Sequence, residues 1–156
     1  MQAWRFDDLA PAPVLFLEEI PQPQPGPDEV LIRIRAIGVT PTELMWYPTT
    51  HTKTGERRSR AIPGHEFSGA VAAVGAETSS VAAGEEVFGM NDWFADGATA
   101  EYCLTRPEWI TRKPLGLTHA DAASVPIGAL TAWQGLFDRA KLKGGERVLI
   151  HGGSGA

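Results

Sequence analysis

The sequence predicts a mainly β fold with short helices, arranged as a compact and partly open barrel. Short apolar runs with strand character recur along the chain, and Gly, Pro, Asn and Asp separate them. The chain also contains 17 glycines and 12 prolines in 156 residues, which favours many turns and few long helices.

The clearest strand signal lies between residues 29 and 37. Alternation there predicts a strand with one buried and one mostly solvated face. The buried set is expected to be Val30, Ile32, Ile34 and Ala36, and the opposite set Leu31, Arg33, Arg35 and Ile37. Shorter strand signals cover residues 14–17, 67–74, 86–89, 98–104 and 109–111.

Prolines alternate with other residues from Pro21 to Pro27. Such a stretch is compatible with an extended ligand for a proline-binding module. It is also compatible with a stiff connector between two strands. We favour the connector, because no flanking low-complexity tail surrounds the stretch.

Two passages have helical character. Residues 42–47 follow Pro41, which suits a first helical position, and predict a turn or two of helix. Thr118 and Asp121 have the spacing of a capping box at the start of a longer helix. Pro126 is expected to break that helix, and a second one to continue to about Arg139. Its apolar face, formed by Leu130, Trp133 and Phe137, predicts packing in the core.

The chain changes character near its end. Residues 147–151 form an apolar run typical of a strand buried on both faces of a parallel sheet. Glycines follow at once, as at the entrance of a dinucleotide-binding βαβ unit. Gly152 and Gly155 match the first two positions of a G-x-x-G-x-x-G/A pattern, although a flexible loop is an alternative for so short a match.

The composition limits the classes of partner that the chain is expected to bind. The net charge of −5 and the pI of about 5.3 give no electrostatic support for binding nucleic acid or an anionic membrane. No stretch approaches the roughly 18 apolar residues of a membrane span, and the charged start does not resemble a signal peptide. Cys103, the one cysteine, excludes an internal disulfide. We therefore expect a cytoplasmic protein.

Five segments, in order and at family spacing, resemble the medium-chain dehydrogenase/reductase superfamily. They are residues 36–43 (AIGVTPTE), 62–75 (IPGHEFSGAVAAVG), 84–89 (GEEVFG), 122–134 (AASVPIGALTAWQ) and 148–155 (VLIHGGSG). The fourth is similar to a segment of the quinone-oxidoreductase branch. The resemblance implies a GroES-like catalytic domain at residues 1–125. It also implies that residues 126–156 begin a Rossmann domain that continues beyond Ala156.

The same resemblance implies hydride transfer between NADPH (or NADH) and a carbonyl, quinone or enone. In the zinc-dependent branch a histidine and two cysteines hold the metal. The histidine matches His65, but Thr40 and Ile127 stand at the cysteine positions. We therefore expect no zinc and a structural, hydrogen-bonded His65 beside Glu66, whose carboxylate could pair with a nearby Arg or Lys. A different metal, held by His65, Glu66 and Glu43, is an alternative.

Site residues follow from the resemblance. Thr40 and Thr42 match residues beside the nicotinamide and in a proton relay, although Thr42 could instead cap the short helix. Thr131 matches a threonine that contacts the cofactor, although it could instead bond a carbonyl one helical turn back. The expected phosphate-binding turn consists of Gly152, Gly153, Ser154 and Gly155.

Several features have two interpretations. Trp46 and Tyr47 could wall a flat acceptor or simply pack. Residues 90–94 could form a mobile lip or a loop closed by its own side chains. The basic run 56–60 could attract an anionic substrate, but we favour a solvated loop.

The leading hypothesis is thus the substrate-side domain of a zinc-independent quinone or enone reductase, inactive as a fragment and homodimeric when complete. An alcohol dehydrogenase with an altered metal site and a non-catalytic GroES-like interaction module are the alternatives.

Overall fold

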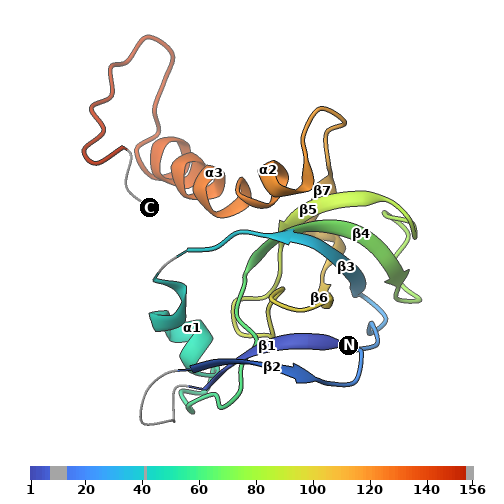
Figure 1. Cartoon of the computed structure of the whole chain (residues 1–156). Coiled ribbons are helices and arrows are strands. Elements are labelled where there is room, and N and C mark those ends of the chain that lie inside the picture. The colour runs from blue at the N-terminus through green and yellow to red at the C-terminus, as the bar shows by residue number, and fades with distance from the viewer. Residues whose placement is uncertain (8–13, 41, 154–156) are drawn as a thin grey trace.

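The computed structural model describes residues 1–7, 14–40 and 42–153, which form two antiparallel sheets and a set of short helices (Figure 1). Strands β1 (Gln2–Asp7) and β2 (Val14–Glu19) pair as a two-stranded sheet. The second sheet has the order β6-β3-β4-β5-β7. Its strands are β3 (Val30–Ile37), β4 (Glu66–Val74), β5 (Glu86–Met90), β6 (Tyr102–Thr105) and β7 (Ile110–Arg112). The prediction of a mainly β fold with short helices is confirmed. Both sheets stay open, and the described strands form no closed barrel.

Strand β3 lies inside the five-stranded sheet, between β6 and β4. Val30 and Ile32 are buried and pack with Phe67 and Val71 of β4, as their alternation predicts. Leu31 is buried as well, and the pairing with β4 shifts register between Ile34 and Ala36. The first half of β3 is thus buried on both faces. More and less exposed side chains alternate only from Arg33 onward.

The core cluster also contains Cys103, which lies on β6 opposite Ile32. Its side chain is buried, and burial raises the pKa of the Cys103 thiol well above its usual range. The thiol therefore stays protonated.

The strand signal at 98–104 is displaced in the structure, where β6 begins only at Tyr102. Ala100 instead forms an isolated bridge with Ala3, and Ala98 N–H donates to the carbonyl of Gly64 over 2.6 Å. Strand β1 itself was not predicted. Its buried residues, Ala3 and Phe6, are three positions apart and break the period of two.

Helices cover one side of the five-stranded sheet (Figure 1). Helix α2 (His119–Ala123) starts with the predicted capping box between Thr118 and Asp121. Pro126 separates it from α3 (Pro126–Trp133), which continues as a π-helical turn, η3 (Gln134–Arg139). Shorter helices are η1 (Glu43–Met45), α1 (Tyr47–Thr50) and η2 (Pro107–Trp109). The passage predicted at 42–47 is therefore split at Trp46, whose backbone is extended.

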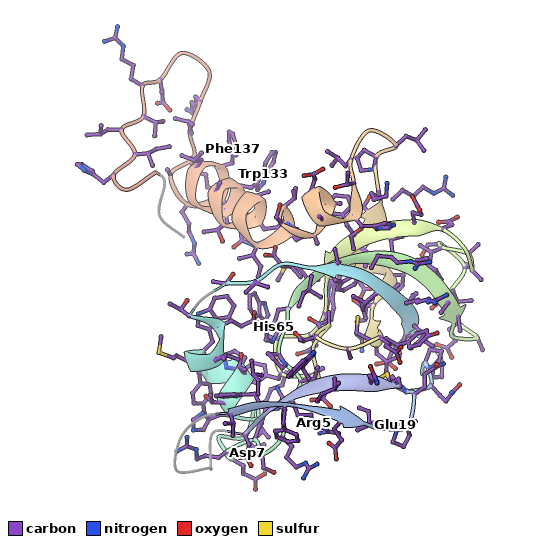
Figure 2. The ribbon with its side chains drawn as sticks, viewed as in Figure 1. Arg5, Asp7, Glu19, His65, Trp133 and Phe137 are labelled. Atoms are coloured by element: carbon purple, nitrogen blue, oxygen red, sulfur yellow. The ribbon has the colours of Figure 1, made fainter. Side chains whose placement is uncertain are left out.

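Two packing predictions were wrong. The face formed by Leu130, Trp133 and Phe137 is exposed rather than buried, and Figure 2 shows Trp133 and Phe137 on the side of the helix away from the sheets. Residues 147–151 form no strand, and Val148, Leu149 and Ile150 are exposed. On the exposed helix face, Trp133 and Phe137 pack on each other, with 4.7 Å between ring centroids. Residues 147–151 have no strand to pair with among the described residues, and a strand without a pairing partner has nothing to satisfy its backbone groups.

Residues 21–27 connect β2 to β3, which confirms the connector interpretation. None of the helices in residues 1–7, 14–40 and 42–153 combines the length and apolar character that crossing a membrane requires.

Candidate functional site

The candidate site forms where the end of β3, the turn before β4 and the start of α3 meet. Gly38 N–H donates to the carbonyl of Glu66 over 3.1 Å. A side chain at Gly38 would overlap the Glu66 carboxylate. Gly64 has a φ of +94°, a conformation that favours glycine and turns the chain into β4. Small residues therefore bring the resemblance segments 36–43 and 62–75 into contact.

His65 lies in the interior of the molecule, with 1% of its surface exposed (Figure 2). Its Nδ1 lies 2.5 Å from Glu43 Oε1, and its Nε2 lies 2.8 Å from the carbonyl oxygen of Trp93. Glu43 Oε1 also accepts from Gly64 N–H over 2.7 Å. Both ring nitrogens thus have partners, as predicted for a structural histidine.

These contacts decide whether the residues fit zinc. A carbonyl oxygen only accepts hydrogen bonds, so His65 Nε2 carries a proton and has no lone pair for a metal. Nδ1 is engaged by Glu43. A metal site needs several unprotonated donors, and the described residues contain no group of three His, Cys, Asp or Glu side chains placed to hold one. The side chains present do not fit a zinc ion or the alternative His65–Glu66–Glu43 site.

Glu66 bonds a backbone N–H at the start of α3. Its Oε2 accepts from Ile127 N–H over 2.8 Å, and no Lys or Arg of the described residues forms an ion pair with it. Burial, supported by the charge of Glu43, raises the pKa of the Glu66 carboxyl, against the lowering effect of the Ile127 hydrogen bond. The suggested ion pair with an Arg or Lys is not formed among the described residues, and a backbone N–H occupies that place.

Aromatic rings gather around His65. The Trp93 ring stacks on the imidazole with 4.9 Å between centroids, and Trp46 lies 5.6 Å from Trp93. Trp46 Nε1–H donates to Thr42 Oγ1 over 3.2 Å. Tyr47 points elsewhere and stacks on His51. Trp46 and Tyr47, which were considered together as a possible wall for a flat acceptor, therefore point to different parts of the structure.

Residues 90–97, which contain the predicted 90–94 passage and are called the 90–97 loop below, form a loop closed by its own side chains. Asn91 Nδ2 donates to the carbonyl of Asp96, and Asp92 Oδ1 accepts from Phe94 N–H. Arg58 of the basic run also holds this loop, through an ion pair of 2.9 Å with Asp96. Arg60 is paired with Glu18. These two cations of the 56–60 run are therefore engaged with carboxylates.

A hollow of about 800 Å3 opens between this loop, the β5–β7 edge and the start of α3. Its lining is mostly apolar and includes Trp93, Phe94, Trp109, Pro126 and Leu130. Thr40, Thr42 and Thr131 are not part of the lining. Of the aromatic cluster around His65, Trp93 is among the residues that line the hollow.

The remaining predicted site residues lie outside the His65 network, and most of them are exposed. Thr40 is half-buried, and Thr42 is exposed at the start of η1, where its side chain makes no capping hydrogen bond. Thr131 is exposed on α3, and its hydroxyl has no hydrogen-bond partner among the described residues, so the bond to a preceding carbonyl is not formed. Gly152 and Gly153 lie in an exposed turn, in which Gly152 has a φ of +68°. Ser154 and Gly155 lie outside the described residues.

Sequence reasoning missed two parts of the site. It named Glu43 for a metal but not as the partner of His65, and it assigned no role to the carbonyl of Trp93. Glu43 is separated from His65 by 22 positions, and a backbone carbonyl leaves no signal in residue types.

Comparison with known proteins then defines the family. The model of the alcohol dehydrogenase GroES-like domain matches residues 26–132. The chain belongs to this family. Its GroES-like domain includes the β3–β4 contact, the His65 network and most of α3.

Relatives of this GroES-like domain include oxidoreductases. A 2-methylene-furan-3-one reductase of Solanum lycopersicum is 30% identical, covering 99% of this chain and 41% of its own length. The quinone oxidoreductase of Homo sapiens is 32% identical, covering 99% of this chain and 46% of its own. The structure of the quinone oxidoreductase from Coxiella burnetii aligns with a TM-score of 0.78 at 27% identity, covering 94% of this chain and 47% of that one. The chain thus spans less than half the length of these relatives.

Proposed function

We propose that the protein containing this chain is a zinc-independent NAD(P)H-dependent oxidoreductase that reduces quinones or enones. The proton on His65 Nε2, required by the 2.8 Å contact with the Trp93 carbonyl, is the observation that carries the zinc-independent part. The similarity to quinone oxidoreductases and to a furanone reductase supports the acceptor class.

A nicotinamide cofactor, when bound, would supply the hydride. The residues of this chain that suit its binding are those with free polar groups on the α3 side. Thr131 offers an exposed hydroxyl without a partner, and Gly152 adopts the left-handed conformation of a tight glycine turn. We propose Thr131, Gly152, Gly153, Ser154 and Gly155 as the cofactor contacts of this segment, with NADPH preferred and NADH possible.

Without a metal, catalysis depends on orienting the acceptor and on donors placed where negative charge develops. Trp46 Nε1–H donates to Thr42 Oγ1 and so occupies a lone pair of that hydroxyl. This contact leaves the Thr42 O–H free to donate, and in the proposed mechanism it donates to the acceptor oxygen. Thr40, two residues earlier and half-buried, would provide a second hydroxyl near the same position.

The test uses the full-length protein encoded by the complete reading frame. NADPH oxidation is followed with a quinone, with a small enone and, in the reverse direction with NADP, with a primary alcohol. We expect turnover of the quinone and the enone, no change on adding a chelator, and no stoichiometric zinc by elemental analysis. Turnover of the alcohol that disappears with the chelator would instead establish the alcohol dehydrogenase alternative.

Association of the full-length protein is a separate measurement. The family resemblance supports a homodimer, and light scattering coupled to size exclusion should give twice the subunit mass. A monomeric mass would contradict this part of the proposal alone.

A further inference from the structure

We infer that Glu43 and His65 are positioning residues that hold the Trp93 ring as one wall of the acceptor site, selective for flat aromatic quinones. This inference rests on the proposed function for its substrate. It assigns a task to the histidine that stands at the metal-ligand position of zinc-dependent relatives.

Both ring nitrogens of His65 are held by partners. Nε2 donates to the carbonyl of Trp93, and Nδ1 lies 2.5 Å from Glu43 Oε1. The same Glu43 oxygen accepts from Gly64 N–H over 2.7 Å, so it is also tied to the turn before β4. Glu43 therefore fixes the orientation of the imidazole.

The imidazole of His65 therefore holds Trp93 through two contacts, one to its backbone and one to its ring. Its Nε2–H holds the backbone carbonyl, and its face packs on the indole, with an interplanar angle of 26°. Trp46 lies 5.6 Å from Trp93 and 6.3 Å from His65, so it packs against the same pair. Anchoring at both the backbone and the ring leaves the indole little freedom to rotate.

The fixed ring is not buried. Trp93 is 37% exposed, whereas the imidazole beneath it is almost fully covered. Trp93 also lines the apolar hollow between the 90–97 loop and α3. A rigid indole with a free part at the rim of an apolar hollow is suited to offset stacking with a flat ring. A small, non-aromatic enone offers no comparable surface.

The experiment compares variants of the full-length protein with 9,10-phenanthrenequinone and with 2-cyclohexen-1-one. His65→Ala removes the anchor. We expect the KM for the flat quinone to rise about three- to tenfold, the usual worth of one aromatic contact. The KM for NADPH should stay unchanged, and the KM for the enone should rise less than the KM for the quinone. Glu43→Gln keeps the side-chain volume but replaces the carboxylate that holds His65 Nδ1 with a neutral amide, so it should raise the same KM.

His119→Ala is the matched control. His119 also hydrogen-bonds a buried strand residue, Ser68, over 2.7 Å, but it does not contact Trp93. It should lower the melting temperature without changing the KM for the quinone. The tryptophan circular-dichroism signal that Trp93→Phe removes should also be absent in His65→Ala.

Three results would overturn the inference. One is an unchanged quinone KM in both folded variants, His65→Ala and Glu43→Gln. Another is an equal rise of KM for both acceptors. A third is zinc in the wild-type protein that His65→Ala removes. If the wild-type protein reduces neither acceptor, the proposed function fails, and the circular-dichroism comparison decides the anchoring of Trp93 by itself.

Discussion

Glu66 Oε2 accepts a hydrogen bond from Ile127 N–H over 2.8 Å and so joins the first residue of β4 to the second residue of α3. The N-cap of this helix, Val125, makes no side-chain capping bond, and Pro126 has no N–H. Glu66 therefore satisfies a helix N–H that would otherwise lack a partner. The helix N-terminus favours the ionised carboxylate, but burial outweighs it, because the pKa of Glu66 is raised.

This raised pKa predicts a pH-dependent stability difference for Glu66→Gln. The ordinary pKa is 4.5 and the folded pKa lies above it, so the folded state favours the protonated carboxyl. The contribution of Glu66 to stability is thus complete below pH 4.5 and is lost as the pH rises through the folded pKa. Glutamine keeps an acceptor for Ile127 N–H and carries no charge. The variant should melt at a higher temperature than the wild type at pH 7 and lose this advantage toward pH 4.5.

Melting curves of both proteins between pH 4 and pH 8 would measure this difference. A variant that melts at or below the wild-type temperature at pH 7 would show that burial does not dominate at Glu66.

The capping box of α2 predicts a cost for Thr118→Ala. Thr118 Oγ1 accepts from Asp121 N–H over 3.1 Å, and the Asp121 carboxylate accepts from Thr118 N–H in return. Loss of the cap should lower the free energy of unfolding by about 1 kcal/mol in urea denaturation. Thr118→Ser preserves the hydroxyl and should stay close to the wild type. Equal losses in the two variants would assign the effect to the methyl group.

Thr131→Val separates cofactor binding from folding. The hydroxyl is exposed and has no partner among the described residues, so its removal should leave the melting temperature unchanged. In the full-length enzyme we expect kcat/KM for NADPH to fall about two- to tenfold, the value of one hydrogen bond. Normal kinetics would remove Thr131 from the cofactor site.

Trp46→Phe tests the orientation of Thr42. Phenylalanine keeps an aromatic ring but cannot donate to Thr42 Oγ1. We expect kcat for enone reduction to fall about two- to tenfold, as it should in Thr42→Val. The double variant should be no worse than Thr42→Val alone, because the two residues act through one hydroxyl. Additive losses would show that Trp46 acts independently of Thr42.

Local signals in the sequence predicted local structure well. The capping box at Thr118, the break at Pro126 and the strand from Val30 were all confirmed, because each depends on neighbouring residues. The burial of the α3 face was predicted wrongly, because burial depends on what packs against the helix and not on its own residues. Periodicity shows that one face is apolar but does not show whether anything in the described chain covers it, and Trp133 is 59% exposed.

The site was predictable in part. Resemblance indicated His65, Glu66 and Thr42, and the structure brings the segments that carry them together. The partners of these residues were not predictable, since Glu43, Trp93 and Ile127 reach the site through contacts across 22, 28 and 61 positions. Two of those contacts use backbone atoms, whose position depends on the fold and not on the residue type.

The burial of Cys103 has a consequence for the proposed reduction of quinones and enones by the full-length protein. Quinones and enones are electrophiles, and they alkylate cysteine as the thiolate rather than as the thiol. The one cysteine of this chain is enclosed in the core, and its raised pKa keeps the sulfur protonated. An acceptor that diffuses in and out of the site therefore meets no reactive sulfur on this domain, so the domain should resist self-inactivation by adduct formation over many turnovers.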